Sequence, residues 1–177
     1  MPKGINLGKY IRNIPDFPKP GILFRDVTTL IQDGRAFKAT VDILVKKYKG
    51  KKIDKVVAVE ARGFIFGAAI AHKLGVGFVP VRKKGKLPYK TNSVTYNLEY
   101  GTDTLEIHKD AVTPGERVII VDDLLATGGT AKGVTELVED LGGKIISIAF
   151  IIELFDLNGR DKLKGYNICS LIKFPGH

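Results

Sequence analysis

The sequence predicts an α/β fold: a doubly wound, mostly parallel sheet flanked by helices, in a single domain over residues 1–177. Short, continuous apolar runs alternate along the chain with amphipathic stretches, which is typical of parallel strands joined by helices. The run Val-Ile-Ile-Val at 118–121 has no polar alternation, which indicates a strand buried on both faces. With 177 residues, 44% of them hydrophobic, the chain is long enough for one complete core.

The first half of the chain supplies four elements in order. Residues 1–32 favour a short helix and then a turn-rich stretch, PDFPKPGILFRD. Asp33 is suited to cap a helix that runs to about Lys49, because its side chain can accept hydrogen bonds from the first turn. A strand over 55–60 and a helix over 63–74 follow. This helix, GFIFGAAIAHKL, is apolar on nearly every side, which favours burial, including burial against a second subunit.

The second half continues the alternation. A strand over 77–82 leads into a basic stretch over 83–94, whose Gly and Pro favour a mobile loop. Segments 95–100 and 103–108 can pair as a hairpin around Gly101. The remaining elements are a strand over 117–122, a helix over 130–141, a strand over 144–152, a helix near 157–164 and a last strand over 166–172.

Charge and composition restrict the class of protein. The chain has 28 basic and 19 acidic residues, a net charge of +9, which favours polyanionic ligands: nucleic acid, or a substrate with several phosphates. Its one cysteine, Cys169, excludes an internal disulfide and fits a reducing cytoplasm. The N-terminus lacks the apolar segment of a signal peptide. The longest apolar stretch, 145–152, is far shorter than the ~20 residues of a membrane helix, so we expect a cytoplasmic protein without a membrane partner.

The most informative segment is VIIVDDLLATGGTA, residues 118–131. Its strand ends in two adjacent carboxylates, Asp122 and Asp123, and the carboxyl ends of parallel strands are where such sheets bind ligands. The turn that follows, here called the phosphate turn, consists of Ala126, Thr127, Gly128, Gly129 and Thr130. Its backbone N–H groups, its hydroxyls and the positive end of the next helix favour a phosphate, with the carboxylates beside it for hydroxyl groups or a metal. The alternative is a strand, turn and helix with an incidental acidic pair.

Two further segments suit anions. Glu60-Ala61-Arg62-Gly63 follows a strand and opens a helix, and Arg62 offers a planar fork for phosphate oxygens. The same local signals fit a capped helix start with a surface arginine equally well. The basic loop, RKKGKLPYK at 82–90, fits a nucleic-acid patch, a solvated loop, or a lid over a charged leaving group.

The 118–131 segment resembles the phosphoribosyl pyrophosphate (PRPP) signature of the type I phosphoribosyltransferases. Four further segments resemble the adenine-specific members of that family: PDFPKPGILFRD at 15–26, the Glu60–Gly63 loop, the basic loop, and SVTYNLEYG at 93–101, in which Asn97 replaces a serine. The resemblance covers about residues 12 to 172. It implies the family's fold, with a small N-terminal hood over residues 1–32 that binds the base, and a flexible loop and hairpin over 83–100.

The resemblance also implies an activity and its partners. The 5-phosphoribosyl group of PRPP would pass to adenine, giving AMP and pyrophosphate in purine salvage. Mg²⁺ would be held mainly by PRPP, with Asp122 and Asp123 as indirect metal contacts. The partners would be adenine, PRPP and a second copy of the chain, as a homodimer, with no nucleic acid.

Residue roles follow from the matched motifs. The implied catalytic residues are Glu99, Arg62, Lys86, Asp122 and Asp123, with Glu99 handling the proton of the purine ring directly or through water. The implied pyrophosphate-binding residues are Glu60, Ala61, Arg62, Arg82, Lys83 and Lys86, and the peptide Glu60–Ala61 would be cis. The adenine-binding residues would be Ile22, Phe24 and Arg25, by aromatic packing and backbone contacts. Two alternatives stay open: a family member that uses another base, and a regulator that kept the fold and binds nucleic acid.

Overall fold

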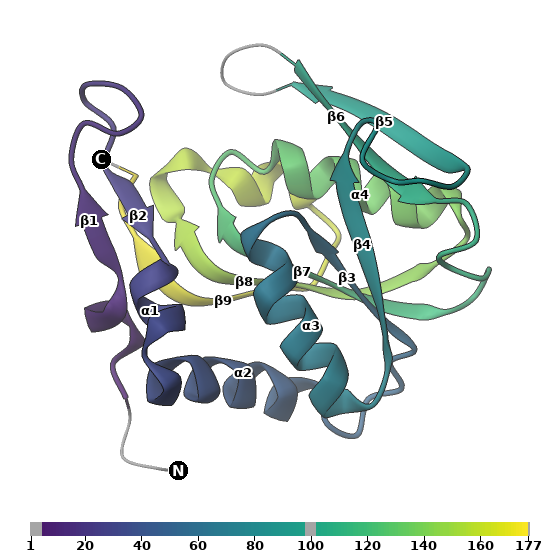
Figure 1. The fold of residues 1–177 in the computed structure, drawn as a ribbon, viewed down its shortest axis with the longest axis horizontal. Helices are drawn as coiled ribbons and strands as arrows, with labels where there is room; N and C mark the ends of the chain where they lie inside the picture. Colours follow the sequence, from purple (N-terminus) through teal and green to yellow (C-terminus); the bar gives the residue numbers. More distant parts are fainter. Residues whose placement is uncertain (1–4, 98–101, 177) are drawn as a thin grey trace.

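A seven-stranded sheet with the strand order β5-β6-β4-β3-β7-β8-β9 forms the centre of the molecule (Figure 1). The structure, a computed structural model, describes residues 5–97 and 102–176. The parallel strands are β3 (Lys55–Val59), β4 (Gly77–Lys83), β7 (Arg117–Leu125), β8 (Lys144–Leu154) and β9 (Ile168–Phe174). At the β4 edge, β6 (Thr102–His108) and β5 (Thr91–Asn97) add an antiparallel hairpin. The predicted α/β architecture is confirmed.

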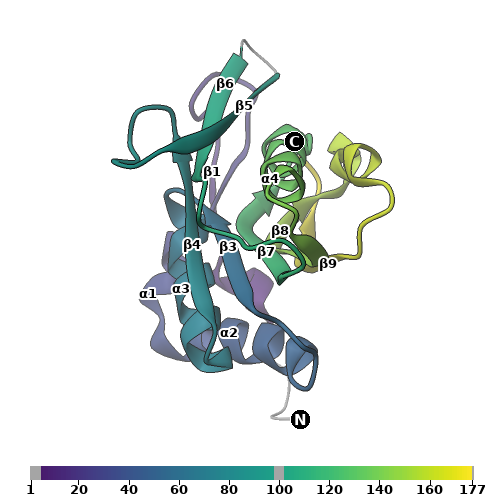
Figure 2. The same cartoon turned by 90° about the vertical axis from the view of Figure 1, so that its right-hand side faces the viewer.

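Helices cover both faces of this sheet (Figure 2). One face carries α1 (Thr28–Gln32), α2 (Gly34–Tyr48) and α3 (Arg62–Leu74), and the other carries α4 (Gly129–Asp140). Successive strand residues point to opposite faces, so Ala58 joins the α2–α3 core while Val57 joins the α4 core. Within residues 5–97 and 102–176, no helix is both long and apolar enough to cross a membrane.

Local sequence explains where these helices begin and how closely they pack. The Asp33 carboxylate accepts hydrogen bonds from the amides of Arg35 (3.0 Å) and Ala36 (2.9 Å), which confirms the predicted cap of α2. Gly67 lets α3 lie close to β3, because a Cβ at this position would be only 2.6 Å from the Cβ of Ala58. The helix α3 therefore packs directly against β3 near the carboxyl end of that strand.

The described part of the hood lies beside β9 (Figure 1). A 3₁₀ helix (Leu7–Tyr10) precedes a small antiparallel sheet of β1 (Arg12–Ile14) and β2 (Phe24–Asp26). An ion pair between Arg12 and Asp26 (2.6 Å) ties the two strands together. The turn-rich stretch between them contains a cis peptide, Phe17–Pro18.

Several predicted boundaries differ from the structure, and three of the differences have a clear cause. Strand 117–122 continues to Leu125, because Asp122, Leu124 and Leu125 keep pairing with β8, so both acids lie within the strand. The predicted loop 83–94 is shorter, because β5 begins at Thr91 and pairs with β6. The helix near 157–164 is two 3₁₀ helices, Phe155–Leu157 and Gly159–Leu163, which are separated by Asn158 in a left-handed conformation (φ 53°).

The close contact between α3 and β3 predicts a stability difference. Gly67→Ala should lower the free energy of unfolding by about 1–3 kcal/mol through overpacking, as measured by urea unfolding. Gly34→Ala is the matched control, because it also adds a methyl group to a helical glycine, and nothing lies within 4 Å of the added Cβ. Equal stability of the two variants would show that α3 can shift away from β3 at no cost.

Candidate active site

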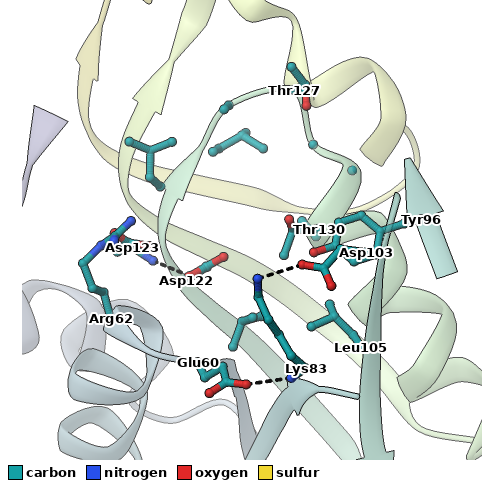
Figure 3. A pocket seen from close by; sticks show the side chains of 17 residues that line it. Glu60, Arg62, Lys83, Tyr96, Asp103, Leu105, Asp122, Asp123, Thr127 and Thr130 are labelled. Atoms are coloured by element: carbon teal, nitrogen blue, oxygen red, sulfur yellow. Dashed lines mark hydrogen bonds and ion pairs between the residues drawn. The ribbon is translucent and has the colours of Figure 1, made fainter. Parts of the chain in front are cut away.

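A cavity of about 550 Å³ opens at the carboxyl ends of β3 and β7 (Figure 3). β3 continues through α3 to β4 on one side, whereas β7 continues through α4 to β8 on the other, so the sheet changes winding direction between them. Ligands of open α/β sheets bind at such switch points. The predicted site residues in the cavity wall are Glu60, Arg62, Lys83, Asp122, Asp123, Ala126, Thr127, Gly128, Gly129 and Thr130.

The phosphate turn joins β7 to the N-terminus of α4. Gly128 caps α4 in a left-handed conformation (φ 80°, ψ 0°), and a Cβ at this position would overlap the carbonyl oxygen of Gly159. Because the first amides of a helix have no partners within it, they and the helix dipole attract an anion. A phosphate group is the ligand that this arrangement suits.

The acid pair, Asp122 and Asp123, lies beside this turn at the base of the cavity. The Asp123 amide donates a hydrogen bond to Asp122 Oδ1 (2.8 Å). Gly63 makes room for this carboxylate, since a Cβ there would lie 2.8 Å from the same oxygen. Burial, together with the neighbouring Asp123 carboxylate, raises the pKa of Asp122. The pair therefore favours ligands that donate hydrogen bonds or carry positive charge.

Arg62 connects the acid pair with the hood. Its Nε donates to Asp123 Oδ2, and its guanidinium carbon lies 5.7 Å from the centre of the Phe24 ring in the hood. The side chain is 44% exposed, whereas that of Asp123 is 10% exposed. Arg62 thus neutralises a buried carboxylate and remains accessible to a ligand in the cavity.

Glu60 holds the basic loop against the site. Its carboxylate accepts hydrogen bonds from the Lys83 amide (2.7 Å), Arg82 Nη2 (3.1 Å) and Lys86 Nζ (3.1 Å). Burial raises the pKa of Glu60, but these donors outweigh it, and the net shift is downward. The peptide Glu60–Ala61 is cis, as the sequence resemblance implies.

Lys83 reaches from the end of β4 across the cavity to the hairpin (Figure 3). Its Nζ lies 2.9 Å from Asp103 Oδ2, and this contact lowers the pKa of the Asp103 carboxyl. The side chains of Arg82 and Lys86 pair with Glu60, and neither residue lines the cavity. Of these three cations, Lys83 is the one that lines the cavity, and its side chain pairs with Asp103 instead of Glu60.

The hood residues lie outside the cavity wall. Phe24 packs edge-on against Phe17, with ring centres 5.2 Å apart. The Arg25 guanidinium donates to Asn13 Oδ1 (2.7 Å) and to the carbonyl of Pro175 (3.0 Å), so this side chain joins the hood to the chain after β9. The Ile22 carbonyl accepts a hydrogen bond from the Phe17 amide (3.2 Å). Ala61 is also outside the wall, and Glu99 lies outside the described residues.

Several wall residues are absent from the sequence interpretation. Tyr96, Asp103 and Leu105 enter from the hairpin. Asp103 and Leu105 are two residues apart on one strand, so their side chains face the same side of the sheet. This alternation is the sequence signal that could have assigned both residues to the site. Gly159 supports the phosphate turn from 33 positions beyond Ala126, and no local signal links the two segments.

Comparisons with known proteins agree with this geometry. The family model described as "Phosphoribosyl transferase domain" matches residues 27–172. An adenine phosphoribosyltransferase from Clostridium botulinum (strain Loch Maree / Type A3) is 60% identical over 170 residues, which covers 96% of this chain and 99% of that protein. This chain belongs to the adenine phosphoribosyltransferase family.

Solved structures of adenine phosphoribosyltransferases share the fold. The enzyme from Thermoanaerobacter pseudethanolicus is 60% identical and superposes with a TM-score of 0.92, covering 95% of this chain and 98% of that one. The Saccharomyces cerevisiae enzyme, solved with an imino-altritol bisphosphate and adenine, is 43% identical with a TM-score of 0.88, covering 93% and 96%. The fold of this chain is thus the fold of these adenine phosphoribosyltransferases.

The raised pKa of Asp122 predicts how stability depends on pH. A carboxyl group whose pKa is raised by folding stabilises the folded state below its ordinary pKa of 3.8, and this contribution is lost as the pH rises. Asp122→Asn removes the titration, and its amide oxygen can still accept the bond from Asp123. The variant should therefore gain stability relative to the native chain as the pH rises above about 4, as measured by thermal unfolding. A pH-independent difference would contradict this account of Asp122.

Proposed function

We propose that this chain transfers the 5-phosphoribosyl group of PRPP to adenine, giving AMP and pyrophosphate in purine salvage. The observation that carries the proposal is the arrangement at the switch point: the acid pair lies near the end of β7, the phosphate turn follows that strand, and Arg62 follows the neighbouring strand β3. PRPP offers a 5′-phosphate, ribose hydroxyls and a pyrophosphate group, and this wall has a complementary group for each.

The phosphate turn and the acid pair would hold the phosphoribosyl part. Anchoring the 5′-phosphate in the phosphate turn uses binding energy remote from the reacting carbon to position that carbon. Asp122 and Asp123 would accept hydrogen bonds from the ribose hydroxyls. Their negative charge would also favour the positive charge that develops at the anomeric carbon.

The reaction forms one bond and breaks another at the anomeric carbon, and it requires cations for the leaving pyrophosphate and an acceptor for the purine proton. Adenine N9 forms the new bond to the anomeric carbon, and the bond from that carbon to the pyrophosphate oxygen breaks, with its electron pair leaving on that oxygen. Arg62, Lys83, Lys86 and Arg82 would neutralise the leaving pyrophosphate. Glu99 would take the purine ring proton, directly or through water.

Magnesium is the proposed metal. No group of three or more His, Cys, Asp or Glu side chains in residues 5–97 and 102–176 converges to hold a metal ion by itself. Mg²⁺ commonly binds one or two carboxylates together with substrate phosphates and water, so the acid pair fits a metal carried mainly by PRPP. When bound, the ion would add positive charge beside the pyrophosphate.

The hood would bind adenine. Phe24 adjoins Arg62, which lines the cavity, so an aromatic face lies next to the proposed ribose position. Backbone groups near Ile22 and Arg25 would read the edge of the base, since the Arg25 side chain is engaged with Asn13 and Pro175.

The proposed working form is a cytoplasmic homodimer that does not bind nucleic acid. One side of α3 is apolar yet uncovered: Ile65 is 41% exposed, and the adjacent Ala68 is also exposed. A second copy would remove this surface from water. Cys169 is a free, buried thiol, which suits a reducing compartment.

Base choice tests the proposed function. Adenine presents an amino donor and an unprotonated N1, whereas hypoxanthine and guanine present a carbonyl and a protonated N1. A backbone edge that pairs with one pattern leaves buried groups unpaired with the other. Turnover assays with these three purines should therefore favour adenine by ~10²-fold or more in kcat/KM. Phe24→Ala should weaken all purines alike, because aromatic stacking does not distinguish them.

Two outcomes would contradict this reading. Comparable turnover of hypoxanthine and adenine would indicate a family member that uses another base. Tight, PRPP-independent binding to RNA or heparin with no turnover of any base would indicate a regulator instead.

The acid pair should affect turnover more than folding. Asp122→Asn combined with Asp123→Asn should lower kcat by ~10²-fold or more, the scale of lost electrostatic stabilisation of a transition state. Steady-state kinetics and thermal unfolding of the same preparation test this. A large fall in melting temperature with nearly normal turnover would make the two acids structural.

A further inference from the structure

The back of the phosphate turn rests on a distant segment of backbone. A Cβ on Gly128 would overlap the carbonyl oxygen of Gly159, and a Cβ on Gly159 would overlap the carbonyl oxygen of Ala126. The two backbones therefore touch with no side chain between them. The position of the phosphate turn thus depends on what holds Gly159, the first residue of the 3₁₀ helix Gly159–Leu163.

The next residue, Arg160, is fixed by a two-pronged ion pair. Its Nε and Nη2 donate to the two carboxylate oxygens of Glu153 at 2.6 and 2.7 Å, and Nη2 also lies 3.2 Å from Ser170 Oγ. The Glu153 residue is only 4% exposed. The hydrogen bond from Arg160 lowers the pKa of Glu153 to about 2, although burial opposes the shift.

The ion pair is in register with the phosphate turn. Glu153 on β8 pairs with Leu125 on β7, the residue immediately before the turn begins. Leu163 ends the same 3₁₀ helix and is fully buried in the α4 core. The segment that touches the phosphate turn is therefore anchored to β8 and β9 by Arg160 and to the core by Leu163.

We infer that Arg160, held by Glu153, is a positioning residue that keeps the phosphate turn in the conformation that binds the 5′-phosphate. Arg160 presses the Gly159 backbone against Ala126 and Gly128, so the amides of the turn keep their spacing. The glycines of the turn leave its backbone flexible, so a contact from outside the turn is needed to fix it. Small displacements of binding groups are costly, since misplacement by about 1 Å can cost ~10²-fold. This inference rests on the proposed function.

The test uses a double variant, because removing Arg160 alone would leave a buried, unpaired carboxylate. Glu153→Met with Arg160→Met replaces the ion pair with apolar groups of similar length, which proteins often tolerate. Lys162→Met is the matched control, since Lys162 is exposed on the same 3₁₀ helix. Thermal unfolding establishes that each variant is folded.

Calorimetric binding of two probes then distinguishes a displaced phosphate turn from a general loss of structure in the cavity. Ribose 5-phosphate uses the phosphate turn, whereas pyrophosphate uses the Glu60–Arg62 side of the cavity. The double variant should bind ribose 5-phosphate about 10-fold or more weakly, with a matching rise in KM for PRPP, and should bind pyrophosphate and adenine as the native chain does. The control should match the native chain for both probes.

Two results would overturn the inference: unchanged ribose 5-phosphate binding by the folded double variant, or an equal loss of both probes. If that variant does not fold, Arg160→Lys tests the inference instead, because lysine keeps the positive charge but cannot form two parallel hydrogen bonds with the Glu153 carboxylate. It should weaken ribose 5-phosphate alone, and normal binding would overturn the inference. A native chain that binds ribose 5-phosphate but forms no AMP would instead refute the proposed function.

Discussion

The parallel pairing of β3 with β7 is the constraint on which the site depends. In this register Ala58 lies opposite Val121, so the two strands reach the same edge of the sheet together. Their chains then leave toward opposite faces, β3 into α3 and β7 into α4. Two helix N-termini and the loops before them therefore meet over one crevice. Anion-binding backbone and the acid pair come together because of the topology, not through any contact between their own side chains.

Within that crevice three carboxylates have basic side-chain partners. Arg62 pairs with Asp123, Lys83 pairs with Asp103, and Glu60 collects the donors of the basic loop. Buried carboxylates without partners would be costly, so these contacts stabilise the folded site. A ligand that disrupts these ion pairs must replace each of them with an equivalent contact. In the proposed complex, the phosphates of PRPP would replace the carboxylates beside Arg62 and Lys83, and its ribose hydroxyls would donate hydrogen bonds to the acid pair.

Much of this arrangement was predictable from the sequence, and the remainder has a common cause. The buried strand, the acid pair and the phosphate turn are contiguous, so their pattern is visible in one segment. Asp103 and Gly159 were missed because each reaches the site through pairing or packing with residues distant in sequence. The extension of β7 to Leu125 was missed for a similar reason, since it is the pairing with β8 that carries the strand past two charged residues. The hydrogen bond from the Arg25 guanidinium to the carbonyl of Pro175 joins residues 150 positions apart, and no local pattern predicts it.

Close approaches of backbone explain why the site needs segments that carry no chemistry. Gly63 admits the Asp122 carboxylate beneath α3, Gly67 brings α3 down onto Ala58, and Gly128 meets Gly159. At each point a single methyl group would separate two elements that together form the wall of the cavity. Glycine makes such contacts possible but also leaves the backbone free to move, so each contact needs a rigid neighbour. For α3 that neighbour is the packed core around Phe66. The phosphate turn lies at the edge of the core, where burial alone fixes less, and there a buried ion pair with defined hydrogen-bond geometry serves the same purpose.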